Sequence, residues 1–157
     1  LEARLSSGDL SFPVKDTIGD LKYWARIGSV ADLLHANTRL AMHLIQGRSG
    51  ARVQYESNSP EIDHIFPRAQ LRKRGVEEAL VNDVANFWIL AKGKNRNKSD
   101  QHPAKYFEDV DDKVLDEALI DRSLFDYDQY GMFLNKRGVR MVEFVSQKIG
   151  CTDGDFA

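Results

Sequence analysis

The amino-acid sequence predicts a mostly helical α+β fold in which a small β-hairpin lies among helices. Apolar residues recur at helical spacing over residues 32–47 and over most of the chain after residue 113. Residues 87–90, Phe-Trp-Ile-Leu, form a continuous β-prone run, and residues 61–67 form a short extended piece that ends in proline. The length of 157 residues suits one domain. Within it we expect a helical flank (1–51), a core that contains the hairpin (52–106) and C-terminal helices (107–157).

The long helical segments have recognisable beginnings and ends. In the first, residues 32–47, Asp32 lies in the first turn, where a negative charge suits the helix dipole, and Gly47 is a stop signal. The apolar positions that recur at helical spacing there are Leu33, Ala36, Leu40 and Leu44. Near the C-terminus we expect one helix over residues 113–120 and another over residues 127–150, which ends at Gly150.

Shorter elements are expected in the middle of the chain. Residues 52–56 predict a strand, and residues 61–67 predict a second one, because Pro67 keeps Phe66 out of the helical region. Residues 68–75 predict a short helix closed by Gly75. Another short helix is expected around residues 94–99, and a further one begins at Pro103.

The composition excludes several classes of protein. A single cysteine, Cys151, excludes an internal disulfide and a Cys-x-x-Cys zinc knuckle, and is typical of a reducing cytosol. No apolar run approaches the roughly 20 residues of a membrane span, and no signal peptide opens the chain. We therefore expect a cytoplasmic protein that does not enter a membrane. Because it begins with Leu1 rather than Met, we expect it to be a piece of a longer protein.

The formal net charge of −2 hides an uneven distribution of charge along the chain. Residues 61–105 carry nine Lys or Arg against six Asp or Glu, a net charge of +3, so the rest of the chain carries −5. A local positive field inside an acidic protein suggests one face that binds an anion. By itself, however, this pattern fits a solvated surface better.

Five polar residues in the middle of the chain form the candidate site: Asp63, His64, Asn86, Asn95 and Lys98. Phosphodiester hydrolysis needs an activated water, a Lewis acid on the phosphate and positive charge near the developing oxyanions. His64 is suited to taking a proton from water at neutral pH. Asp63 and Asn95 offer the hard oxygen ligands that Mg²⁺ prefers. Lys98, about one turn beyond Asn95, would add a cation, and Asn86 would accept a hydrogen bond from His64 and so orient it.

This set resembles the HNH, or ββα-metal, endonuclease family, in which a strand ends in Asp-His, a second strand starts at Asn and a helix carries the last ligand. The shape Asp-His-Ile-x-Pro…Asn…Leu…Lys-Asn-Arg-x-Lys-Ser-Asp is shared with the HNH lobe of RNA-guided CRISPR effectors. The HNH domain carried C-terminally by ParB-like nucleotide-hydrolase proteins of restriction and phage defence fits better, because RNA-binding lobes are absent here. The resemblance covers residues 61–106.

The resemblance implies a DNA endonuclease that nicks one strand with Mg²⁺ or Mn²⁺. It assigns the general base to His64, the metal ligands to Asp63 and Asn95, the middle asparagine to Asn86 and a recurrent lysine to Lys98. The final ligand of the family is usually histidine, whereas here it is Asn95, as in the CRISPR branch. The zinc-binding cysteine quartet of many relatives is absent. A regulatory or nucleotide-hydrolysing domain is expected N-terminal to this piece.

Basic side chains on both sides of the candidate site would grip the DNA backbone without sequence specificity. The residues expected in this role are Arg68, Arg72, Lys73, Arg74, Lys92, Lys94 and Arg96. The acidic run over residues 107–128 is interpreted as a solvated face turned away from DNA, or as a docking surface for the missing domain.

Other interpretations stay open at this point. The chain is alternatively a catalytically degenerate HNH fold that only binds DNA, or a helical interaction domain with a decorative hairpin. His64 would then be an ordinary strand-end histidine, and Asn95 a helix cap. For Asn82 and Asn97 the role of turn former is the better account, and for Phe66, Phe87 and Trp88 a place in the core.

Overall fold

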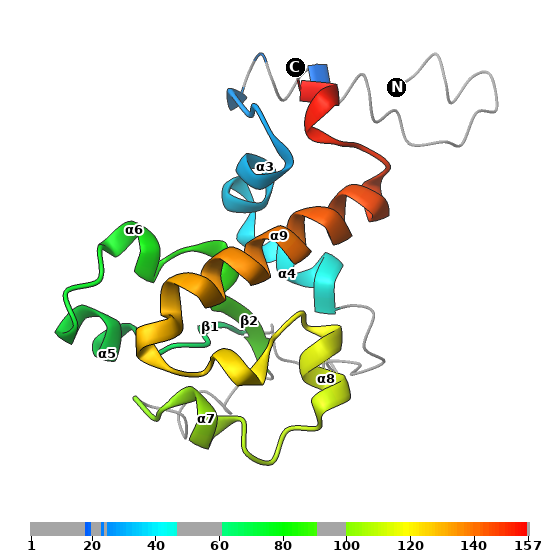
Figure 1. Ribbon diagram of the computed structural model, residues 1–157. Helices are drawn as coiled ribbons and strands as arrows, with labels where there is room; N and C mark the ends of the chain where they lie inside the picture. Colours follow the sequence, from blue (N-terminus) through cyan, green and yellow to red (C-terminus); the bar gives the residue numbers. More distant parts are fainter. Residues whose placement is uncertain (1–17, 20–22, 24, 47–60, 91–99, 157) are drawn as a thin grey trace.

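The computed structural model describes residues 18–19, 23, 25–46, 61–90 and 100–156 (Figure 1). This part of the chain is mostly helical and contains a two-stranded antiparallel sheet, which confirms the predicted α+β class. The predicted strand at residues 52–56 and the predicted helix at residues 94–99 lie outside the described residues. Among the described residues, no helix is both long and apolar enough to cross a membrane.

The helix predicted over residues 32–47 is two helices. Helix α3 spans Val30–Ala36 and α4 spans Thr38–Gln46, and they are separated by Asn37, which has φ −139° and ψ 70°. The Asn37 side chain explains the break, because its Oδ1 accepts a hydrogen bond from Leu40 N (3.0 Å) and so caps α4.

The break at Asn37 also changes which apolar residues face the core. The two helices bury Val30, Leu34, Ala41, Met42 and Ile45. Of the apolar positions expected to share one helix face, Leu33 and Leu44 are only partly buried, and Leu40 is 50% exposed. The apolar positions at helical spacing therefore do not form the buried face of these helices.

The hairpin lies where the sequence predicts it. Strand β1 spans Glu61–His64 and pairs antiparallel with β2, Phe87–Leu90, so that Asp63 lies opposite Trp88 and His64 opposite Phe87. On the other side of β2, the side-chain amide of Gln46, the last residue of α4, bonds both backbone groups of Ile89 (2.5 and 3.3 Å). This amide takes the place of a neighbouring strand and ties α4 to the hairpin.

Two short helices and a 3₁₀ turn connect the strands. Helix α5 spans Arg68–Lys73 and is followed by Gly75, whose φ of +74° suits the predicted stop. Helix α6 spans Glu78–Val81, and the 3₁₀ turn η1 spans Val84–Asn86. The chain therefore reaches Asn86 in a tight turn and enters β2 at the next residue.

The acidic run is used mainly to begin short helical turns. Helix α7 (Pro103–Tyr106) is followed by α8 (Asp112–Glu117) and by the 3₁₀ turns η3 (Arg122–Leu124) and η4 (Tyr127–Gln129). In α8, η3 and η4 the residue before the first turn is an aspartate whose carboxylate accepts a backbone N–H two residues later; these are Asp111, Asp121 and Asp126. The run is thus a series of caps rather than one continuous helical face.

The long C-terminal helix α9, Tyr130–Ile149, crosses the middle of the molecule and contacts α3, α4 and η1 (Figure 1). It ends at Gly150 in the left-handed conformation (φ +69°), as predicted, and the 3₁₀ turn η5, Asp153–Phe156, follows. Phe66, fully buried just beyond β1, lies at the centre of an aromatic cluster with Phe125, Tyr130 and Phe133. The core assignment of Phe66 and Trp88 is confirmed.

Candidate functional site

Asp63 and His64 are the last two residues of β1, and both are partly exposed. The pairing continues one residue past the strand, since Ile65 N donates to Asn86 O at 2.7 Å. The chain then turns at Phe66 and Pro67 into α5. Strand β1 and the turn after it thus place the carboxylate and the imidazole at one end of the hairpin.

Asp63 belongs to the face of the hairpin that packs on α7. Its cross-strand partner Trp88 is buried against Tyr106 and Phe107, with ring centroids 5.8 and 4.6 Å apart. Burial raises the pKa of Tyr106 to about 12, and the negative charge of Asp63 adds to the shift. The carboxylate therefore lies close enough to the Tyr106 phenol for its field to matter.

His64 belongs to the opposite face of the hairpin. Its ring lies 4.6 Å from that of Phe87, its cross-strand partner, and its Nε2 lies 3.2 Å from Asn82 Oδ1. Because successive residues of a strand point to opposite faces, a phosphate that meets both Asp63 and His64 must lie at the end of β1 or across its edge.

Asn82 links His64 to a charged pair. Its Nδ2 donates to the backbone oxygen of Glu78 (3.0 Å) and to Glu78 Oε1 (2.8 Å). Arg72 in turn donates from Nε to Glu78 Oε2 (2.9 Å) and from a terminal nitrogen to Oε1 (2.5 Å). The hydrogen bonds from Arg72 and Asn82 lower the pKa of Glu78 to about 2. A continuous chain of hydrogen bonds therefore runs from Arg72 through Glu78 and Asn82 to His64.

Asn86 has a different role from the one expected. Its side chain is fully buried: Oδ1 accepts from Phe66 N (2.9 Å), and Nδ2 donates to Val81 O (3.0 Å) and Phe66 O (3.3 Å). The His64 ring contacts Asn82 instead, so the expected hydrogen bond from His64 to Asn86 is wrong. Asn86 therefore joins the turn after β1 to the end of α6 and supports the position of His64 indirectly.

A second buried polar residue supports the same turn from α9. Arg137 is 2% exposed and donates to the backbone oxygens of Ala85 (2.5 Å), Phe87 (2.7 Å) and Ala118 (3.2 Å). Burial lowers the pKa of its guanidinium to about 9, so the group is still charged at neutral pH. Arg137 thus fastens the start of β2 to the long helix.

The basic residues of α5 are not equivalent. Arg72 is bound to Glu78, and Arg74 lies over the ring of Tyr127, 3.7 Å from its centroid, while it also donates to the backbone and side-chain oxygens of Gln70. Arg68 and Lys73 are exposed at the surface. The positive charge of Arg68 contributes to the lowered pKa of Glu78. The structure thus gives Arg72 and Arg74 partners within the protein.

Five predicted site residues lie outside the described residues: Lys92, Lys94, Asn95, Arg96 and Lys98. The convergence of Asp63 and Asn95 on one cation therefore stays a prediction. Within the described ranges, no cluster of three or more His, Cys, Asp or Glu side chains is arranged to hold a metal ion. The predicted Mg²⁺ site does not need such a cluster, since it consists of one carboxylate, one amide oxygen and water.

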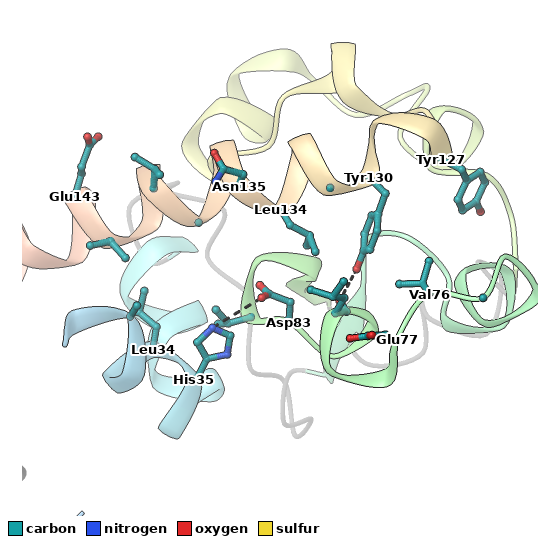
Figure 2. Close-up of a pocket in the computed structure, with 18 residues that line it drawn as sticks. Leu34, His35, Val76, Glu77, Asp83, Tyr127, Tyr130, Leu134, Asn135 and Glu143 are labelled. Atoms are coloured by element: carbon teal, nitrogen blue, oxygen red, sulfur yellow. Dashed lines mark hydrogen bonds and ion pairs between the residues drawn. The ribbon is translucent and has the colours of Figure 1, made fainter. Parts of the chain in front are cut away.

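A groove of about 900 Å³ lies on the other side of α6, between it, α3 and α9 (Figure 2). Its wall includes Leu80, Leu134 and Val139, and its polar lining includes His35 and Asp83, which face each other with 3.9 Å between Nε2 and Oδ2. Neither Asp63 nor His64 lines it. The groove is therefore separate from the candidate site.

Asn82 was expected to be only a turn former, and its contact with His64 was not predicted. It does end α6, yet its side chain also reaches β1, 18 residues away. The four-residue spacing of Glu78 and Asn82 indicates only that these two helical side chains meet. His102 caps α7 through Nδ1, which lies 3.2 Å from Ala104 N.

Comparison of the chain with protein-family models, with curated proteins and with solved structures found no match.

Proposed function

We propose that this chain is a divalent-metal-dependent DNA endonuclease domain that nicks one strand, and that it serves as the effector part of a bacterial restriction or phage-defence protein. The proposal rests on the resemblance of residues 61–106 to HNH nucleases. One structural observation carries it further. Asp63 and His64 end a strand whose antiparallel partner begins directly after Asn86, the order of strands and motif residues that the resemblance implies.

In the proposed reaction, His64 accepts a proton from a water molecule while the water oxygen attacks phosphorus. The bond between phosphorus and the 3′-oxygen breaks, and the leaving oxygen takes a proton from solvent. The partial exposure of His64 suits this role, since the ring must meet both water and the phosphate. Bound Mg²⁺ or Mn²⁺, held by Asp63 and Asn95, would polarise the phosphate and stabilise the leaving oxygen. Lys98 would add positive charge beside the phosphate.

The proposed DNA contacts surround this centre. Arg68 and Lys73 on α5 are exposed and available to neighbouring phosphates. Lys92, Lys94 and Arg96 would bind the backbone from the segment that follows β2. Such contacts are independent of sequence and weaken as salt concentration rises.

A plasmid assay tests the proposal. Supercoiled plasmid is incubated with the 157-residue chain and Mg²⁺ or Mn²⁺, and nicked circles are counted. We expect nicking by the wild type and a loss of at least about 100-fold in His64→Ala, the usual contribution of a general base. His35→Ala is the matched control, because His35 is an exposed histidine on α3 and should leave nicking unchanged.

Absence of nicking in both metals, or equal nicking by His64→Ala and the wild type, contradicts the catalytic proposal. If DNA is bound in a salt-dependent way without cleavage, the chain is a DNA-binding module with a degenerate HNH fold.

A further inference from the structure

The orientation of the Asn82 side chain is determined by its contacts. Its Nδ2 faces two groups of Glu78 that only accept hydrogen bonds, a backbone oxygen and a carboxylate oxygen. The opposite assignment would place an oxygen against both of these oxygens. Asn82 therefore presents Oδ1 to His64, and the ring nitrogen at 3.2 Å must donate the hydrogen.

The Asn82 side chain is held in turn by Glu78 and Arg72. Glu78 receives two parallel hydrogen bonds from Arg72, a bidentate geometry that fixes the plane of the carboxylate. Glu78 Oε1 then accepts from Asn82 at 2.8 Å, and the backbone oxygen of Glu78 provides a second acceptor. Two acceptors on one residue leave the Asn82 amide little freedom to rotate.

We propose that Asn82, backed by the Arg72–Glu78 pair, is a positioning residue that holds the imidazole of His64 with its Nε2–H directed at Asn82 Oδ1. This inference rests on the proposed nuclease function and names residues outside the motif that carries the resemblance. It also divides the basic residues of α5 into two groups. Arg72 orients the histidine through Glu78 and Asn82, whereas Lys73, the next residue, binds the DNA backbone.

The first test is spectroscopic and does not depend on cleavage. Nitrogen-15 NMR of the 157-residue chain, at one pH at which the ring of His64 is neutral, reports which ring nitrogen carries the proton. We expect Nε2–H in the wild type. We expect a mixture of both tautomers in Asn82→Ala. Asn135→Ala is the control, because Asn135 is an exposed asparagine on α9 and should keep the wild-type signal.

The second test compares kinetic parameters for nicking. We expect Asn82→Ala to lower kcat about 10- to 100-fold, the usual effect of removing a group that orients a ligand or base, with KM within about twofold. Arg72→Ala should lower kcat in the same direction by a smaller factor. Lys73→Ala, one residue away on the same helix, should raise KM and leave kcat unchanged.

The outcomes separate the two proposals. If Asn82→Ala keeps the wild-type tautomer, or if its kcat equals that of the wild type, the positioning role is overturned even though the chain nicks DNA. If the tautomer depends on Asn82 and no variant, including the wild type, nicks DNA, the proposed function fails and the placement of the ring stands. Glu78→Gln, which leaves Asn82 in place, provides the same comparison if Asn82→Ala does not fold.

Discussion

Asn82 and Asn86 lie four residues apart, and the difference between their surroundings separates stability from proposed function in this molecule. Asn86 is fully buried and binds three backbone groups around the turn after β1. Asn82 is exposed and joins side chains: His64 on one side and Glu78 on the other. The same carboxamide therefore serves two purposes that are set by burial.

The physical reason is the cost of an unsatisfied polar group. A buried donor or acceptor that loses its partner destabilises the folded protein by about 1–3 kcal/mol. At the surface, a water molecule replaces the lost partner. Replacement of buried groups such as Asn86 and Arg137 should thus lower the free energy of unfolding. Exposed groups such as Asn82 and Glu78 should hardly affect folding, so that any effect on nicking reports on function. The following predictions test this division, beginning with the largest expected effect.

Replacement of Arg137 should have the largest effect on stability. Arg137→Ala leaves three backbone oxygens without their donor and opens a cavity beneath η1, so the free energy of unfolding should fall by about 3–5 kcal/mol. Urea denaturation followed by circular dichroism measures this change. The control is Arg140→Ala, which removes only a surface ion pair with Asp116 and should cost about 0.5 kcal/mol or less. Similar losses in both variants would contradict the division by burial.

Replacement of Asn86 should follow. Asn86→Ala leaves Phe66 N without its acceptor and two buried carbonyl oxygens without their donor. We therefore expect the free energy of unfolding to fall by about 2–4 kcal/mol in the same measurement. Asn82→Ala should cost less than about 1 kcal/mol, because its partners are exposed to water. A loss in Asn82→Ala as large as that in Asn86→Ala would show that the exposed chain of hydrogen bonds is also a structural one.

The caps of the acidic run should give an intermediate effect. Asp121→Ala removes the acceptor for Ser123 N and should cost about 1 kcal/mol, whereas Asp109→Ala, in an exposed turn, should cost less than about 0.5 kcal/mol. The hydrogen bond from the Ser123 hydroxyl lowers the pKa of Asp121. Its contribution is therefore complete above the carboxyl pKa of the unfolded chain and is lost as pH falls through the lowered value. Thermal melts of the two variants at neutral and acidic pH test both statements.

The smallest effect is expected at Glu78. Its pKa is lowered to about 2, so the pair with Arg72 contributes above the ordinary glutamate pKa and disappears as the pH falls from about 4 towards 2. Because both side chains are exposed to water, the thermal midpoint of Glu78→Gln at neutral pH should lie within experimental error of the wild type. A clear drop in midpoint would place Glu78 among the structural residues.

Much of the fold could be predicted because its signals are local. Pro67 and Gly75 bound α5, Gly150 ends α9, and the β-prone run at residues 87–90 is β2. Two local signals were undervalued. Asn37 divides the first long helix, because its short polar side chain competes for backbone groups. Aspartates of the acidic run cap short helical turns in addition to carrying surface charge.

In the candidate site, the adjacent Asp63 and His64, the strand that carries them and the asparagine before β2 could all be predicted, since they depend on adjacency and strand propensity. Which asparagine contacts the histidine depends on the three-dimensional packing, because the two residues are 18 positions apart. The same holds for the contact of Arg137 with Ala85, 52 positions away. Docking of the end of α6 beside β1 brings the first pair together, and packing of α9 on η1 brings the second together. No spacing rule along the chain encodes a contact that depends on how separate elements dock.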